Sequence, residues 1–340
     1  MIIIDGSFGE GGGQILRTSL GLSAVTGNSF KINNIRANRN KPGLMKQHLA
    51  SVNAAAEICS ADVEGNFIGS KELSFRPGKA SGGKYIFRIG SAGSTTLVLQ
   101  TILPVILNSA EDYEIIIEGG THNPFSPPFD FLKDSFCGIL NKMGFKIDVE
   151  IIRHGFYPAG GGCIKAVIKK HTALNCLELN DSSINKIEAV SIIANLPYKI
   201  AESEIKIIAN DFNLKKEDYR TSIVNSDGPG NAVILKAVNN DLTNTFTAFG
   251  EKGIKLEEVC ENLKTQVNSF FVSGACADEH LQDQLLIPMA FAGGSFTTLK
   301  PSLHTLTNID VIKKFIDINI KCSMIKEDLY EIKIIKQGDK

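Results

Sequence analysis

A recurring pair of helix-opening signals constrains the fold of this chain more than any other feature. In each occurrence a turn residue precedes an apolar, helix-like run, and a second helix-like run begins about 20 to 35 residues later, led by proline. The pairs lie at Gly13 and Pro42, at Gly93 and Pro127, and at Asp283 and Pro301. Self-similarity at a fixed period indicates repeated structural units, so we expect three similar units of about 85 residues. The alternative is the approximate spacing that any chain of alternating strands and helices shows.

Strand-like and helix-like runs alternate through the first half of the chain, which predicts an α/β (α+β) fold. The strand-like runs are 30–35, 72–75, 84–89, 114–118, 145–152 and 164–168. The helix-like runs are 14–26, 44–58, 95–107 and 129–143.

Three units of about 85 residues leave about 85 of the 340 residues unassigned, which indicates a domain inserted between the second and third units. The polar stretch 180–183 marks the start of this insert. Beyond it we expect a strand over 187–194, a helix over 201–210, three strands within 219–249 and an amphipathic helix over 256–271. We therefore predict a large domain formed by 1–181 and 277–340, and a smaller inserted α/β domain formed by 182–276.

Composition excludes several classes of protein. The net charge of −1 argues against a protein that coats long nucleic acid, although it leaves room for one local basic pocket. Seven scattered cysteines and the absence of an apparent signal peptide favour a reducing cytoplasm. The longest apolar run, 95–107, is too short to span a bilayer, so no membrane association is expected. Nothing in the chain implies an obligate protein partner.

The segment Gly6–Arg17 contains five glycines, one carboxylate and one arginine between an apolar strand and an apolar helix-like run. Glycine permits close backbone approach to a ligand, and a helix N-terminus presents free N–H groups to anions. Glu10 could hold a metal ion or a proton, and Arg17 could reach a phosphate. The segment therefore predicts a polyphosphate-binding site, and the alternative is a flexible glycine-rich turn.

A second segment that could bind an anion is 35–48, where four basic residues lie at or just before the start of a helix-like run. Arginine side chains such as those of Arg36 and Arg39 can each donate two hydrogen bonds to the oxygens of one phosphate group. A solvated basic turn is the alternative. Two such segments near the start of the chain favour one shared pocket.

His304 lies in the polar segment 300–308, where a histidine is most often structural. Histidine is also a nucleophile toward phosphorus, because its ordinary pKa near 6.5 leaves one ring nitrogen free at neutral pH. The resulting phosphorus–nitrogen bond is labile and suits an intermediate that is handed on.

Seven segments, in order along nearly the whole chain, resemble the RNA 3′-terminal phosphate cyclase family. The most distinctive is His154-Gly-Phe-Tyr-Pro-Ala-Gly-Gly-Gly162. The others are 9–17, 35–44, 90–94, 227–231, 283–284 and 301–308. The family's fold, three βαβαββ-type units with a smaller inserted domain, agrees with the three-unit prediction.

The resemblance implies an ATP-dependent enzyme of the family's catalytic branch. Such enzymes attach AMP to a histidine, pass it to an RNA 3′-phosphate, and form a 2′,3′-cyclic phosphate as AMP leaves. The implied substrates are ATP and RNA 3′-phosphate ends, with a divalent cation, Mg²⁺ or Mn²⁺.

By the same resemblance, His304 is the nucleophile and Glu10 holds the cation. The RNA-end and phosphate pocket would contain Arg17, Arg36, Arg39 and Gln47. The ATP pocket would contain Gln100, Pro127, His280, Leu281, Gln282, Asp283 and Gln284. The family often has a tyrosine where this chain has His280, so the adenine contact is the feature in which this sequence departs from the pattern.

Two alternatives stay open. Some relatives keep the fold as non-catalytic factors of ribosome assembly, but they lack the nucleophilic histidine and parts of the glycine and arginine set. Enolpyruvyl transferases share a related repeated architecture and need no covalent AMP.

Overall fold

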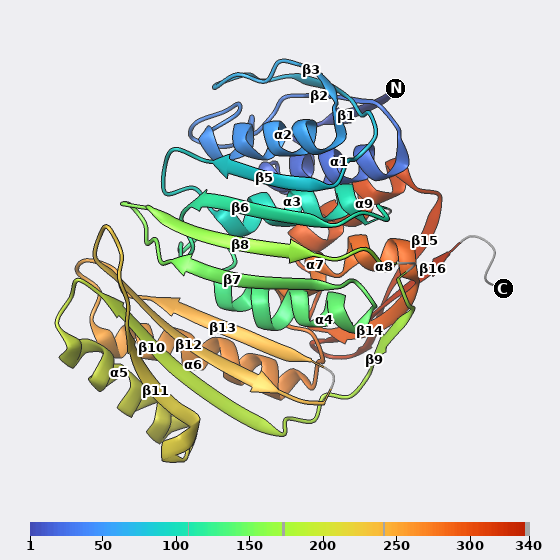
Figure 1. Ribbon diagram of the computed structural model, residues 1–340. Coiled ribbons are helices and arrows are strands. Elements are labelled where there is room, and N and C mark those ends of the chain that lie inside the picture. Colours follow the sequence, from blue (N-terminus) through green and yellow to red (C-terminus); the bar gives the residue numbers. More distant parts are fainter. Residues whose placement is uncertain (108, 172–173, 241, 337–340) are drawn as a thin grey trace.

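The computed structural model describes residues 1–107, 109–171, 174–240 and 242–336. Its strands form four mixed sheets of four strands each, with helices packed against them (Figure 1), so the predicted α/β class is confirmed. Among these residues no helix is long and apolar enough to cross a lipid bilayer.

Three of the sheets share one strand order and one pattern of pairing. In each of them two neighbouring strands are parallel and the other two pairings are antiparallel. The first sheet contains β1 (Ile2–Asp5), β2 (Phe30–Asn33), β3 (Asp62–Glu64) and β4 (Leu73–Arg76). The second contains β5 (Gly83–Arg88), β6 (Tyr113–Gly119), β7 (Ile147–Arg153) and β8 (Gly162–Ile168). The third contains β9 (Leu177–Leu179), β14 (Gly294–Thr298), β15 (Ile318–Lys326) and β16 (Leu329–Lys336).

The helices between these strands bring distant parts of the chain together. They are α1 (Gly13–Thr26), α2 (Lys46–Cys59), α3 (Thr95–Ile106), η1 (Phe131–Phe136), α4 (Cys137–Lys142), α7 (Leu281–Gln284), α8 (Leu286–Ala292) and α9 (Leu303–Phe315). Helix α1 packs against both α3 and α9, and residues of all three belong to one large hydrophobic core. Because α1 and α9 are neighbours, the glycine-rich N-terminal segment lies beside the segment that contains His304.

The segment predicted as one helix over 129–143 has two forms. It is π-helical over η1 and α-helical over α4. Hydrophobic periodicity does not distinguish a short π-helical turn from an α-helical one, which explains why the sequence predicts one continuous helix.

The fourth sheet lies inside the predicted insert, but the insertion point falls within the third sheet, between β9 and β14, rather than between the second and third units. The fourth sheet contains β10 (Lys186–Ala194), β11 (Tyr219–Ile223), β12 (Gly230–Val238) and β13 (Thr243–Phe249), with α5 (Tyr198–Asp211), η2 (Lys216–Asp218) and α6 (Leu256–Ser273). The domain limits at 181/182 and 276/277 stay a prediction.

Successive residues of these strands point to opposite faces, so the fourth sheet has two apolar faces. One face packs on α5 and α6 around a core of its own. The other packs on η1 and on Phe156, which follows β7. On this second face Lys236 forms ion pairs with Asp130 and Asp134, and Ser135 donates a hydrogen bond to Thr245.

Candidate active site

The helix α9 starts at the residue before His304. Its N-cap is Ser302, whose Oγ accepts a hydrogen bond of 3.2 Å from the backbone N–H of Thr305. This cap places His304 in the first turn, where its side chain is about half exposed, at 53%. The imidazole is therefore reachable by a ligand although its helix packs in the core.

A hydrogen-bonded chain orients the imidazole. Its Nδ1 lies 2.8 Å from Gln14 Oε1, and Gln14 Nε2 donates to Asp283 Oδ2 over 2.6 Å. Because an amide oxygen only accepts, the hydrogen must be on Nδ1 of His304. The lone pair of a neutral ring is consequently on Nε2.

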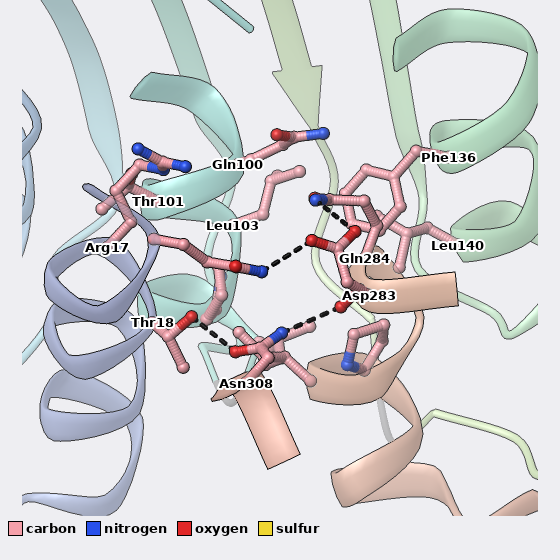
Figure 2. A pocket seen from close by; sticks show the side chains of 15 residues that line it. Arg17, Thr18, Gln100, Thr101, Leu103, Phe136, Leu140, Asp283, Gln284 and Asn308 are labelled. Atoms are coloured by element: carbon pink, nitrogen blue, oxygen red, sulfur yellow. Dashed lines mark hydrogen bonds between the residues drawn. The ribbon is translucent and has the colours of Figure 1, made fainter. Parts of the chain in front are cut away.

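Asp283 is itself held from the side of α9. Asn308 donates from Nδ2 to the backbone oxygen of Asp283, and Thr18 donates from Oγ1 to Asn308 Oδ1. Figure 2 shows this chain from α1 across to Asp283. Burial raises the pKa of Asp283 above its usual range, although several polar neighbours oppose the shift.

Burial also lowers the pKa of His304 below 6.5, and the positive charges of Arg17 and Arg39 add to this effect. Asp283 opposes the shift. The unprotonated imidazole is therefore the favoured form at neutral pH, which is the form that a nucleophile needs.

Glu10 lies on the Nε2 side of the ring. Its Oε1 forms an ion pair with Arg39 and is 3.9 Å from His304 Nε2, while its backbone N–H donates to Thr307 Oγ1 over 3.1 Å. Its other carboxylate oxygen, Oε2, is buried and makes no hydrogen bond. A buried oxygen with no partner is a donor atom available to a ligand or cation.

The glycines next to Glu10 are required by this close packing. Gly9 has a φ of +56°, and a Cβ there would lie 2.2 Å from Thr307 Oγ1. A Cβ on Gly12 would lie 2.2 Å from Glu10 Oε2. Side chains at these positions would displace Glu10 from the imidazole.

A small pocket lies between α1, α3 and α7. Figure 2 shows Arg17, Gln100, Asp283 and Gln284 around it. Burial lowers the pKa of Arg17 to about 10, partly opposed by Asp283, so its guanidinium is still charged at neutral pH. Both side-chain polar atoms of Gln100 are buried without a hydrogen-bond partner.

His304 also lines a larger cavity of about 380 Å³. Pro127, His280, Asp283 and Gln284 line it as well. This volume lies within the range of small-molecule sites. The structure thus places four residues of the predicted ATP pocket around the cavity that His304 lines.

Other predicted residues have different surroundings. Leu281 is fully buried in the hydrophobic core, and Gln282 is fully buried with both of its side-chain polar atoms unpartnered.

Two of the predicted RNA-end residues make structural hydrogen bonds. Arg36 donates to the backbone oxygens of Lys41 and Gly43, so part of its guanidinium stabilises its own loop. Gln47 Oε1 accepts a 2.7 Å hydrogen bond from the backbone N–H of Ser94 and so fixes the turn before α3.

Sequence reasoning did not assign a role to Gln14, Asn308 or His48. The first two orient His304 and Asp283, as described above. His48 accepts a hydrogen bond from the backbone N–H of Met45 and lies next to Arg17 and Gly13. All three residues lie in the segments 6–17, 35–48 and 300–308 described above. The spacing of residues within these segments does not show which side chains lie near His304.

Comparison with known proteins identifies the family. The sequence model of the RNA 3′-terminal phosphate cyclase family matches residues 8–322. The chain belongs to the RNA 3′-terminal phosphate cyclase family. It is 47% identical over 326 residues to the RNA 3′-terminal phosphate cyclase of Koribacter versatilis, covering 95% of this chain and 92% of that protein. The cyclase of Ectopseudomonas mendocina is 42% identical over 340 residues, covering 99% of this chain and 98% of that protein.

Among solved structures, the cyclase-family chain is similar to the enolpyruvyl transferase NikO from Streptomyces tendae, with 8% identity and a TM-score of 0.39. The match covers 96% of this chain but spans about half, 48%, of the NikO chain. At this TM-score the similarity supports no argument about function.

Proposed function

We propose that this protein uses ATP to convert RNA 3′-phosphate ends into 2′,3′-cyclic phosphates, with His304 carrying AMP between ATP and the RNA. Family membership supports the overall reaction. The observation that supports the covalent step is the orientation of His304, in which Nδ1–H donates a hydrogen bond to Gln14 Oε1 and Nε2 keeps a free lone pair.

In the first step, Nε2 attacks the α-phosphorus of ATP. A P–N bond forms, the bond between the α-phosphorus and the bridging oxygen breaks, and pyrophosphate leaves. The hydrogen stays on Nδ1, where Gln14 Oε1 stabilises the positive charge that develops on the ring. Asp283 keeps the Gln14 amide in the orientation that accepts this hydrogen.

In the second step, an oxygen of the RNA 3′-phosphate attacks the same phosphorus and displaces His304. The neighbouring 2′-oxygen then attacks the RNA phosphate, its proton is lost, and AMP leaves. Positioning supplies much of the rate of this last step, because the 2′-hydroxyl is already adjacent. Arg17 and Arg39, whose charges both act on His304, are placed to balance the phosphate charge during transfer.

A divalent cation fits the donor set at Glu10. Its buried, unpartnered Oε2 offers one carboxylate oxygen, and Mg²⁺ typically binds one or two carboxylates together with substrate phosphates and water. Within the described part of the chain, no cluster of three or more acidic, histidine or cysteine side chains could hold a metal by itself. Bound there, the cation would supply charge neutralisation on the phosphates.

Labelling with ATP tests the proposal. The protein, incubated with α-³²P-ATP and Mg²⁺ and then denatured, should carry an acid-labile label. His304→Ala should carry none, whereas Leu303→Ala, which changes an exposed neighbour in the same turn, should keep it. An unlabelled wild-type protein would contradict covalent adenylation and favour a non-catalytic or transferase relative. Label that persists in His304→Ala would contradict the role of His304 as the nucleophile.

A further inference from the structure

The segment His154–Gly162 connects β7 to β8, and the mechanism above gives it no role. Its Phe156 is buried against the fourth sheet, but the next residue, Tyr157, is 60% exposed. Three glycines follow, and Gly160 and Gly161 have positive φ. The segment therefore anchors one aromatic ring in the core and presents a second ring on the surface.

Tyr157 lines the largest cavity described, a groove of about 720 Å³ between this segment and the fourth sheet. Its lining is mainly apolar and includes Phe125, Phe156 and Ile254. Phe125 is 90% exposed, so its ring also lacks packing partners over most of its surface. Large rings left unpacked in one groove indicate a binding surface rather than a structural core.

The groove adjoins the cavity of His304. The two share Pro124, Phe125 and Phe249 as lining residues. A ligand in the groove can therefore extend directly toward the nucleophile.

The His154–Gly162 segment also packs close to Gln47, one of the predicted RNA-end residues. The Gln47 side chain accepts a hydrogen bond from Ser94, at the end of the turn that contains Ala92. A Cβ on Gly160 would lie 2.8 Å from the Cα of Ala92, so the His154–Gly162 segment packs directly on that turn. The turn that Gln47 fixes and the segment that carries Tyr157 are therefore packed against each other.

We propose that this groove binds the nucleobases of the RNA chain upstream of its reacting 3′ end, through stacking on Tyr157 and Phe125. This inference rests on the proposed function, since it assigns a path to the same substrate. Aromatic rings stack on any base, because every base has a π-face, so the groove supports binding without demanding a sequence. The groove is lined by Lys252 but also by Glu204 and Glu251, so we expect the stacked bases rather than the RNA backbone to supply the affinity.

Abasic scanning in the absence of ATP tests the proposal directly. Fluorescent ten-nucleotide RNAs with a 3′-phosphate, each lacking one base, are titrated with wild-type protein, Tyr157→Ala and Tyr157→Phe. Wild type should bind about tenfold more weakly to the RNA that lacks the base facing Tyr157. Tyr157→Ala should bind the intact RNA about tenfold more weakly than wild type does, and removal of that same base should cause no further loss. Tyr157→Phe should behave as wild type, and Phe67→Ala, which removes a similarly exposed ring elsewhere, should change nothing.

The outcomes separate this inference from the proposed function. Labelled adenylation of His304 in Tyr157→Ala should match wild type, because that step needs no RNA. If adenylation is normal but RNA affinity is independent of Tyr157 at every position, the groove serves another ligand and the inference is wrong. Loss of wild-type adenylation would refute the proposed function, while the binding scan would still decide the role of the groove.

Discussion

His304 illustrates how single residues set the chemistry of this site. Its pKa lies below 6.5 because the ring is partly buried and because Arg17 and Arg39 repel a second positive charge. The hydrogen that Nδ1 donates in its hydrogen bond to Gln14 stays on the ring, and the proton that titrates is a second one, on Nε2. Acid should therefore inactivate the nucleophile only when the pH falls below its lowered pKa.

We expect the adenylation rate at low ATP to be constant at neutral pH and to fall with a midpoint below 6.5. Such measurements report the ionisation of the free enzyme. Arg39→Gln removes a charge that lowers the pKa and also releases Glu10, so its midpoint should move upward. Arg88→Gln on β5, an exposed control, should leave the midpoint where it is. A wild-type midpoint above 6.5 would contradict the environment described for His304.

The candidate site was only partly predictable from sequence. Residue type and motif indicated His304, Glu10 and the arginines, because nucleophiles and phosphate ligands come from a short list of side chains. Gln14 and Asn308 were not predicted, since their roles depend on α1 and α9 lying side by side. Contacts between residues 290 positions apart, such as those of Thr18 with Asn308, leave no local pattern.

At the scale of elements, a histidine in the first turn of α2, His48, must stay neutral. His48 accepts the hydrogen bond from Met45 N–H at the start of this helix. Burial lowers its pKa to about 3, and the charges of Arg17 and Arg36 contribute. A protonated ring could not accept this hydrogen bond and would repel both guanidinium groups.

The stability of the protein should therefore depend on the ionisation of His48. Its folded-state pKa lies below the unfolded value of about 6.5, so its contribution is present above pH 6.5 and is lost as the pH falls toward 3. Between pH 7.5 and pH 5.5, wild type should lose about 1 kcal/mol more than His48→Gln in urea unfolding. His280→Gln, a change at an exposed histidine, should follow wild type. Parallel curves for wild type and His48→Gln would show that His48 titrates normally.

Elements as a whole were more predictable than their details. Short runs rich in β-branched residues located β6 and β8, and long apolar periodicity located α1 and α3, because buried segments are apolar. The short strands β3 and β9 have three residues each and carry no such period. Their pairing is determined by neighbouring strands.

For the whole molecule, the attachment of the fourth sheet to η1 combines apolar packing with one charged cluster. Lys236 Nζ lies 3.3 Å from Asp130 Oδ1 and also pairs with Asp134, and its side chain is only 17% exposed. The other oxygen of Asp130 is 3.2 Å from His122 Nε2. This cluster lies behind the Phe125–Tyr157 groove, whose lining includes His122, so movement of the sheet would alter the groove.

Removing the Lys236 charge should destabilise the protein because it leaves Asp130 and Asp134 without their cation. We expect Lys236→Met, which keeps most of the apolar stem, to cost about 3 kcal/mol in urea unfolding followed by circular dichroism. Lys206→Met provides the matched control, since Lys206 pairs with Glu202 on the exposed face of α5 and should contribute less than about 1 kcal/mol. Equal effects of the two substitutions would show that apolar packing alone holds the fourth sheet. A large effect of Lys236→Met should also weaken RNA binding, because the groove depends on this sheet.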